Sequence, residues 1–168
     1  MQQLRIKRTT KMILDIENTK QKEFYTEPRP VVIAIDYDGT LVIEKEYDNP
    51  NYVPKPTALM NTLVNLKKKY GNKLYYILWT CRYEEDGSLK ECLDFCNNYG
   101  LSFDSINENY PNLPFNTSNK IYANLYIDNR SIINYMTDNI EDDHARAYKY
   151  FIEYIIEQNK DNYHLDEL

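Results

Sequence analysis

The chain has 168 residues, the length of one domain that can bury a sizeable core. Apolar residues make up 42% of the sequence and charged residues 27%, ordinary globular values that exclude a chain disordered throughout. The formal net charge of −6 argues against a large nucleic-acid footprint, because phosphate backbones are bound by clustered Lys and Arg. Contact with a nucleotide or a single nucleic-acid end stays compatible with this charge.

The sequence shows no segment for membrane insertion or export. No apolar run approaches the ~20 residues of a membrane span, and the basic residues 1–16 lack the apolar stretch of a signal peptide. The three cysteines, Cys81, Cys92 and Cys96, are too few for a disulfide framework and are expected to be reduced. We therefore expect a cytoplasmic protein without membrane contact, and interpret the C-terminal LDEL as a chance match to a retention signal.

The first predicted elements are an N-terminal extension and a buried strand. Residues 1–29 mix charges, predict a helix at about 9–23 and end at prolines that stop a helix. The continuous apolar run VVIAID at 31–36 is typical of a strand covered on both faces, as in a parallel sheet. The polar, proline-containing residues 41–56 predict a flap or hairpin loop.

Helices and strands then alternate along the rest of the chain. In order, the patterns predict a helix at about 56–70, a strand at 74–79, a helix at about 87–99, a short strand at 102–106, a polar loop at 107–118, a strand at 124–128 and an amphipathic helix at about 141–158.

This alternation predicts an α/β fold, a three-layer Rossmann-like parallel sheet with helices on both faces. We expect one such domain over residues 30–160, after the extension 1–29 and before a flexible tail at 161–168.

Polar residues follow three of the four predicted strands. Asp36 and Asp38 follow the first, Thr80 the second and Asp128 the fourth. Because parallel strands end at one edge, where open α/β sheets bind ligands, these residues can meet in space. The three aspartates supply the oxygen ligands that Mg²⁺ prefers, and a divalent cation relieves their mutual repulsion. Thr80 and Lys120 can then bind a phosphoryl group through a hydrogen bond and a positive charge.

These residues resemble the four motifs of the haloacid dehalogenase (HAD) superfamily. Asp36-Tyr37-Asp38-Gly39-Thr40 resembles its first motif, DxDGT, while Thr80, Lys120 and Asp128 match the second, third and fourth in the right order and context. The sequence is most similar to the small capless HAD hydrolases of Bacteroides and phages, in the segments Trp79-Thr80-Cys81-Arg82, Asn107-Glu108-Asn109-Tyr110-Pro111 and Ile127-Asp128-Asn129-Arg130. One departure is Asn129, which stands where those proteins have a second acid.

The resemblance implies a HAD-like hydrolase that cleaves phosphomonoesters with Mg²⁺ through an aspartyl-phosphate. Asp36 would attack phosphorus, and Asp38 would protonate the leaving oxygen and then deprotonate water. The carboxylates of Asp36 and Asp128 and the backbone carbonyl of Asp38 would hold Mg²⁺. No interval between the motifs has room for a cap domain, so the site is expected to be open.

Several alternatives stay open from the sequence. Arg82 either binds the substrate phosphate or pairs with one of the acids at 84–86. The phosphorylated substrate is a small molecule or a macromolecular end, so a nucleotide or polynucleotide-end phosphatase is one alternative and a catalytically silent binding or regulatory domain is another. A homo-oligomer would be one way to close the open site. We expect His144 at the surface and Asn107 and Tyr110 at the edge of the site, where they shape its loop.

Overall fold

The structure is a computed structural model that describes residues 27–43, 53–131 and 140–168. Its elements, in chain order, are β1 (Val31–Ile35), α2 (Ala58–Tyr70), the short 3-10 helix η1 (Gly71–Lys73), β2 (Leu74–Leu78), α3 (Ser88–Asn98), β3 (Ser105–Ile106), β4 (Leu125–Ile127), α4 (Ile140–Asn159) and the 3-10 helix η3 (Leu165–Glu167). The helix expected at 9–23 and most of the flap expected at 41–56 lie outside the described residues.

The four strands form one sheet in the order β3-β2-β1-β4, and every neighbouring pair is parallel. β1 is central, with Ile35 in register with Leu78 of β2 and Ile127 of β4. The residues that follow these strands therefore emerge together at the carboxyl edge. This topology confirms the predicted α/β fold with an all-parallel sheet.

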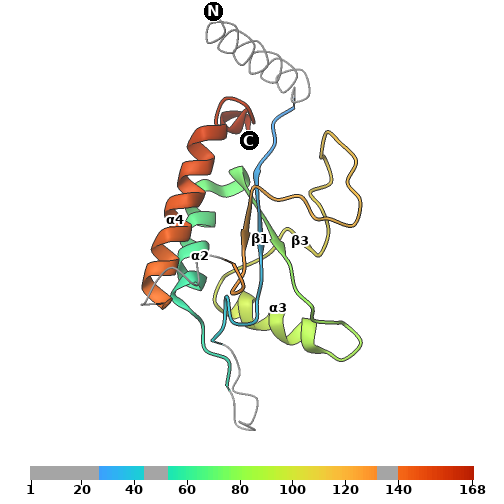
Figure 1. Ribbon diagram of the computed structural model, residues 1–168, viewed down its shortest axis with the longest axis vertical. Coiled ribbons are helices and arrows are strands. Elements are labelled where there is room, and N and C mark those ends of the chain that lie inside the picture. The colour runs from blue at the N-terminus through green and yellow to red at the C-terminus, as the bar shows by residue number, and fades with distance from the viewer. Residues whose placement is uncertain (1–26, 44–52, 132–139) are drawn as a thin grey trace, which may run out of the picture.

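The two faces of β1 contact different layers. Val31, Ile33 and Ile35 belong to the main buried cluster, which also contains apolar residues of α2 and α4. These two helices pack against each other on one side of the sheet (Figure 1). Ala34 alternates to the other face, where the connection between β3 and β4 approaches the sheet and Tyr110 contacts Tyr75. The sheet therefore lies between two covering layers.

α2 is tied at its start to the turn that follows β1. Thr57, directly before the helix, donates from Oγ1 to the carbonyl oxygen of Thr40 at 2.8 Å, and its backbone N–H donates to the Leu41 carbonyl at 2.9 Å. Val42 and Pro56 form an antiparallel bridge, which closes the base of the segment expected to be a flap. The helix and the first predicted motif thus hold each other in place.

The expectation of a flexible tail is wrong for the residues after α4. Tyr163 and Leu165 are 7% and 0% exposed, because the tail folds back onto the amino end of the sheet (Figure 1). The guanidinium of Arg29 lies 3.7 Å from the centre of the Tyr163 ring, and the backbone N–H of Arg29 donates to the Tyr163 carbonyl. An ion pair of 2.7 Å between Lys73 and Asp166 holds the last residues.

The surface position expected for His144 is also wrong. His144 is only 7% exposed, because it lies one helical turn before Tyr148 on the buried face of α4. The cysteines are all free, as expected, and Cys92 and Cys96 are fully buried. None of the helices in the described ranges has both the length and the hydropathy needed to cross a bilayer.

Candidate active site at the carboxyl edge of the sheet

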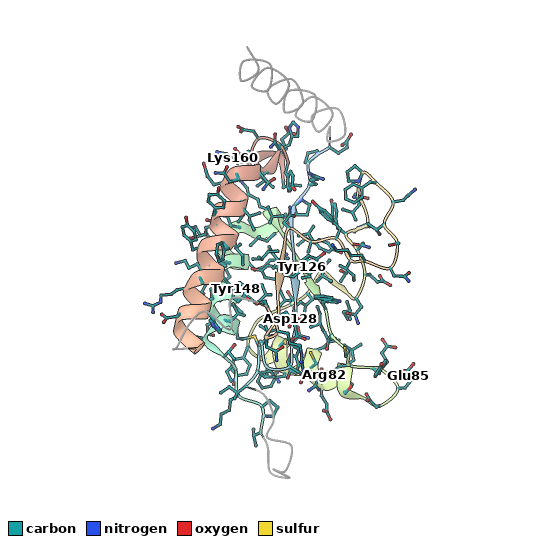
Figure 2. All side chains as sticks on the ribbon, viewed as in Figure 1. Arg82, Glu85, Tyr126, Asp128, Tyr148 and Lys160 are labelled. Carbon is teal, nitrogen blue, oxygen red and sulfur yellow. The ribbon has the colours of Figure 1, made fainter. Side chains whose placement is uncertain are left out.

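The carboxyl edge brings together the residues that follow β1, β2 and β4. The Asp36 N–H donates to the Ile127 carbonyl at 2.9 Å, and the Trp79 N–H donates to the Ile35 carbonyl at 2.8 Å. These bonds extend the sheet by one residue and place Asp36 between the ends of its neighbouring strands. Figure 2 shows Asp128 and Arg82 near this end of the molecule, opposite Lys160 at the far end of α4.

The turn after β1 requires glycine at position 39. Gly39 has φ +73°, in the left-handed region that side chains disfavour, and a Cβ there would lie 2.2 Å from Nδ2 of Asn129. The Tyr37 carbonyl accepts the N–H groups of Thr40 and Leu41, which closes the turn. The glycine of the DxDGT pattern is therefore set both by its backbone conformation and by the close approach of Asn129.

Asp36 lies in a partly buried and negatively charged environment. Burial raises its pKa from 3.8 to about 6, the hydrogen bond from Thr40 opposes this change, and the charge of Asp128 adds to it. Thr40 donates from Oγ1 to Asp36 Oδ2 at 2.8 Å and accepts the Asn129 N–H at 2.8 Å. One oxygen of Asp36 is thus fixed by a hydroxyl that the backbone of the fourth motif orients.

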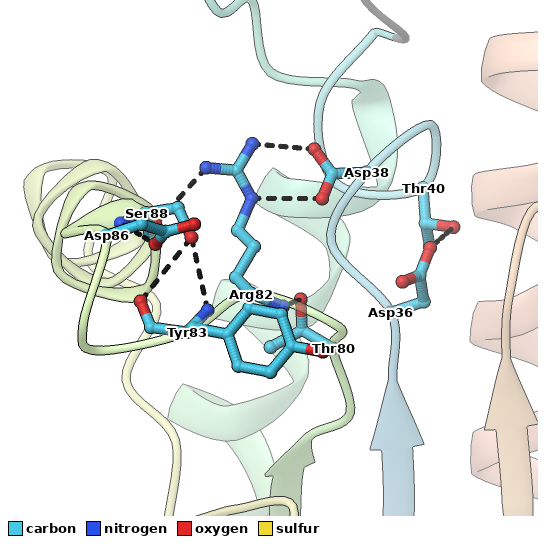
Figure 3. Close-up of polar contacts among 8 residues, drawn as sticks. All are labelled: Asp36, Asp38, Thr40, Thr80, Arg82, Tyr83, Asp86 and Ser88. Carbon is cyan, nitrogen blue, oxygen red and sulfur yellow. Dashed lines mark hydrogen bonds and ion pairs between the residues drawn. The ribbon is translucent and has the colours of Figure 1, made fainter.

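Arg82 pairs with Asp38 through two hydrogen bonds (Figure 3). Its Nε donates to Oδ2 at 2.9 Å and its Nη2 to Oδ1 at 2.7 Å, while Nη1 donates to the Ser88 carbonyl at 3.2 Å. The guanidinium also lies 4.7 Å from the centre of the Tyr37 ring, and the Asp38 hydrogen bonds raise the pKa of Arg82. Arg82 therefore pairs with Asp38, and not with one of the acids at 84–86 that the sequence offered as alternative partners.

Asp86, one of those three acids, instead accepts a hydrogen bond from the first residue of α3. Its Oδ1 accepts the Ser88 N–H at 2.9 Å, and the Ser88 hydrogen bonds lower its pKa.

Thr80 is held by the side-chain amide of Asn107. The Thr80 N–H donates to Asn107 Oδ1 at 2.9 Å, and Asn107 Nδ2 donates to the Thr80 carbonyl at 2.8 Å. Asn107 itself has φ +51°, a conformation that Asn tolerates better than most residues, and its N–H donates to the Leu78 carbonyl. The sequence placed Asn107 only at the edge of the site, and nothing in its spacing indicated this clamp on Thr80.

Asp128 keeps one oxygen available. Its Oδ1 accepts the backbone N–H of Arg130 at 2.7 Å, and its carbonyl accepts the backbone N–H of Ser131 at 3.0 Å. These two bonds fix the turn after β4. Ser131 and Tyr148 share a hydrogen bond of 2.8 Å, so α4 supports this turn. Oδ2 of Asp128 has no hydrogen bond with any residue that the structure describes.

Lys120 lies in the connection between β3 and β4. Its side chain is exposed, and within the described ranges it makes no hydrogen bond or ion pair with the three aspartates. The connection reaches back to the amino edge before β4 begins at Leu125, because β4 is parallel to its neighbour (Figure 1). The structure therefore brings Asp36, Thr80 and Asp128 to one edge and does not join Lys120 to them. Between Thr80 and Lys120 the chain holds only α3, β3 and loops, and no cap domain.

A cation would have two carboxylates and a backbone oxygen as candidate ligands. No group of three or more His, Cys, Asp or Glu side chains in the described part of the chain is arranged to hold a metal ion. The carboxylate of Asp38 points to Arg82 instead of joining Asp36 and Asp128. Burial first, and the charge of Asp128 after it, raise the pKa of Asp36, and Asp128 has an available oxygen, so the donor chemistry of these oxygens fits a hard divalent ion.

A solved structure, described as a conserved protein from Bacteroides thetaiotaomicron, is similar to this chain. The two are 30% identical, the match covers 74% of this chain and 92% of the other, and the TM-score is 0.53. This chain belongs to the family of that Bacteroides protein. No protein-family model matches the sequence, and no curated protein does. The family thus supports the fold, and the reaction has to be argued from the site.

Proposed function

We propose that the chain is a Mg²⁺-dependent phosphomonoester hydrolase of the HAD type, with Asp36 as the nucleophile. The observation that carries the proposal is the environment of Asp36. This carboxyl group lies at the end of the central strand, is partly buried, and has one oxygen fixed by Thr40. Thr80, which the Asn107 amide holds, lies two residues after the neighbouring strand β2.

Asp36 would act as a nucleophile through its second oxygen. That oxygen attacks phosphorus, an oxygen–phosphorus bond forms, and the bond to the leaving oxygen breaks, which gives an aspartyl-phosphate. Water then attacks the phosphorus and releases phosphate and the free carboxylate. Since Thr40 holds Oδ2 at 2.8 Å, the hydrogen bond presents one defined oxygen to the substrate.

Asp38 would move the protons of both steps. Its side chain is 54% exposed at the open edge, so a leaving oxygen and later a water can reach it. Arg82 holds its carboxylate in one orientation through two hydrogen bonds. A bound phosphate offers oxygens of the same geometry to the guanidinium, so Arg82 can share its donors between Asp38 and the substrate.

Mg²⁺ would be held by the carboxylates of Asp36 and Asp128 and the backbone carbonyl of Asp38. When bound, the ion neutralises charge on the phosphoryl group and on the aspartates. Thr80 and the N–H groups of the turn after Asp36 would donate hydrogen bonds to phosphoryl oxygens. Lys120 stays a proposed source of positive charge, which requires its loop to approach the edge when substrate binds.

The deciding experiment is Mg²⁺-dependent hydrolysis of p-nitrophenyl phosphate by the wild type and by Asp36→Asn. We expect activity that needs the metal and is lost in Asp36→Asn. Asp161→Asn, which changes an exposed aspartate near the opposite end, should keep wild-type activity. If the folded wild type shows neither hydrolysis nor Mg²⁺-dependent binding of vanadate, the catalytic proposal fails and the silent-domain alternative replaces it.

A further inference from the structure

Three aromatic residues in β4, directly after β2 and in the loop that follows β2 keep part of their side chains exposed. Trp79 and Tyr83 are 39% and 64% exposed, and Tyr126 is partly exposed. We call these three residues the aromatic rim. Two of them flank the proposed phosphate-binding residues in sequence, because Trp79 directly precedes Thr80 and Tyr83 directly follows Arg82.

Two residues of the rim, Trp79 and Tyr126, lie on opposite sides of the central strand β1. Trp79 follows β2 and lies level with Asp36, since its backbone N–H donates to the Ile35 carbonyl. Its ring meets the ring of Tyr126 on β4 edge to face, with centroids 5.3 Å apart and planes at 62°. β1 runs between these two strands and contributes the small Ala34, in register with Tyr126. The two rings thus meet across the strand that carries the proposed nucleophile.

The rim is anchored by polar contacts at its bases. The Tyr126 hydroxyl donates to the Ile121 carbonyl, which fixes the ring that supports Trp79. The Tyr83 N–H donates to Ser88 Oγ at 3.1 Å, and that hydroxyl donates to the Tyr83 carbonyl at 3.4 Å. Figure 3 shows the Tyr83 ring on the same loop as Arg82, turned away from the Arg82–Asp38 pair. The Tyr126 ring is therefore fixed through its hydroxyl and Tyr83 through its backbone, while part of the aromatic surface faces solvent.

The geometry points to a substrate whose leaving group carries a flat aromatic ring that packs on the aromatic rim. This inference rests on the proposed function, which puts the phosphoryl group between Asp36 and Thr80 and the remainder of the substrate over the open edge. Fixed, exposed aromatic surface beside a polar site is typical of recognition of flat apolar groups. A phenyl ring and a nucleobase share this chemistry.

The charge of the same loop favours a small monoester over a polynucleotide end. Glu84, Glu85 and Asp86 follow Tyr83 directly and are all exposed. A nucleic-acid strand that continued past the rim would bring further phosphates towards these carboxylates, and like charges repel. A small ester brings only the phosphate that the site would bind.

Fluorescence offers a direct test, because Trp79 is the only tryptophan in the chain. Asp36→Asn with Mg²⁺ would be titrated with benzyl phosphate and with cyclohexylmethyl phosphate, which have the same charge, similar size and alcohol leaving groups of similar acidity. We expect a saturable change in tryptophan emission with benzyl phosphate, at a dissociation constant roughly 3- to 10-fold lower than for the cyclohexyl ester. Adenosine 5′-monophosphate serves as a third ligand, and tighter binding than benzyl phosphate would identify a nucleobase as the ring.

Kinetics test the same preference during turnover. In the wild type, kcat/KM for benzyl phosphate should exceed that for cyclohexylmethyl phosphate roughly 3- to 10-fold. Trp79→Leu and Tyr83→Leu should bring this ratio close to one, with circular dichroism confirming the fold. Tyr150→Leu is the matched control, since Tyr150 is also 64% exposed but lies on α4, and it should leave the ratio unchanged.

The outcomes separate the two proposals. If the wild type hydrolyses both esters equally and Trp79 emission does not distinguish them, the ring inference is overturned and the phosphatase proposal stands. If the ratio falls equally in Tyr150→Leu, the preference does not come from the rim and the inference is again overturned. If neither ester is hydrolysed and neither changes the emission of the folded protein, both proposals fall together.

Discussion

The guanidinium of Arg82 holds the carboxylate of Asp38 through two parallel hydrogen bonds, 2.9 Å from Nε and 2.7 Å from Nη2. The two residues are 44 positions apart and come from the ends of β2 and β1. Such bidentate pairs are stronger than single contacts and fix orientation as well as charge. The pair therefore sets the direction of the proposed proton-transfer group before any substrate arrives.

Replacing Arg82 by Lys should lower kcat/KM for p-nitrophenyl phosphate by about 10- to 100-fold, because lysine keeps the charge and loses the fork of donors. Steady-state kinetics of Arg82→Lys measure this loss. Arg146→Lys is the matched control, since Arg146 is an exposed arginine on α4 that pairs with Asp143, and its kcat/KM should equal that of the wild type. Wild-type activity in Arg82→Lys would show that the two-pronged contact is not needed.

Gly39→Ala should lower the free energy of unfolding by about 2–3 kcal/mol, from the positive φ and from overlap with Asn129. Thermal unfolding followed by circular dichroism measures it. Gly87→Ala separates the two causes, because Gly87 has φ +78° with nothing within 4 Å, so it should cost only the strain. Adding Asn129→Ala to Gly39→Ala should recover the overlap part, and no recovery would contradict a direct clash.

Asn107→Gly should raise KM for phosphate esters, because Gly accepts the positive φ but removes both hydrogen bonds that fix Thr80. The unfolding free energy should fall by about 1–3 kcal/mol. Asn109→Gly is the control, since Asn109 also makes two hydrogen bonds in the same connection, to Thr117 and to the N–H of Tyr122. Equal KM values for the two variants would mean that the clamp acts on stability alone.

Asp36→Asn should stabilise the metal-free protein at pH 8 and much less at pH 4. The pKa of Asp36 is raised from 3.8 to about 6 by burial, so the folded state binds the proton more tightly than the unfolded chain. Stability contributed by this group is present below about pH 4 and is lost as pH rises through about 6. We expect a difference of about 1–2 kcal/mol at pH 8 after allowance for solvent screening.

Chemical or thermal unfolding in EDTA at the two pH values measures this difference, with Asp161→Asn as an exposed control. Adding Mg²⁺ at pH 8 should raise the midpoint of the wild type by more than that of Asp36→Asn, because binding to the folded state alone stabilises it and the variant keeps only the other proposed ligands, the Asp128 carboxylate and the Asp38 carbonyl. A wild type that is more stable than Asp36→Asn at pH 8 in EDTA would contradict the raised pKa.

The sequence predicted the sheet, and the meeting of three candidate residues at its carboxyl edge, because their signals are local. A continuous apolar run identifies a buried strand, and an acid directly after that run is predicted to lie at the carboxyl edge of a parallel sheet. Asp36, Thr80 and Asp128 meet there for that reason. The partner of Arg82 and the clamp by Asn107 depend on contacts 44 and 27 positions apart, which no spacing rule encodes.

The errors have the same physical origin. His144 reads as a surface residue because it is polar, yet its place one turn before Tyr148 puts it on the packed face of α4. The polar tail reads as frayed, but two apolar residues in it, Tyr163 and Leu165, find a site at the amino end of the sheet. Both outcomes were decided by tertiary burial, which outweighs local composition.

The position of β1 also bears on the order in which parts of the fold open under mild denaturation. β1 is hydrogen-bonded on both sides and fully buried, whereas β3 is a two-residue strand at the border of the sheet. Amide hydrogen exchange at Ile33–Ile35 should therefore require global unfolding, while β3 and the adjoining Asn107 can open on their own. Asp36 and the support of Thr80 then belong to different cooperative units. Warming or mild denaturant would therefore loosen Thr80, the proposed phosphate-binding residue, while β1 still holds Asp36, the proposed nucleophile.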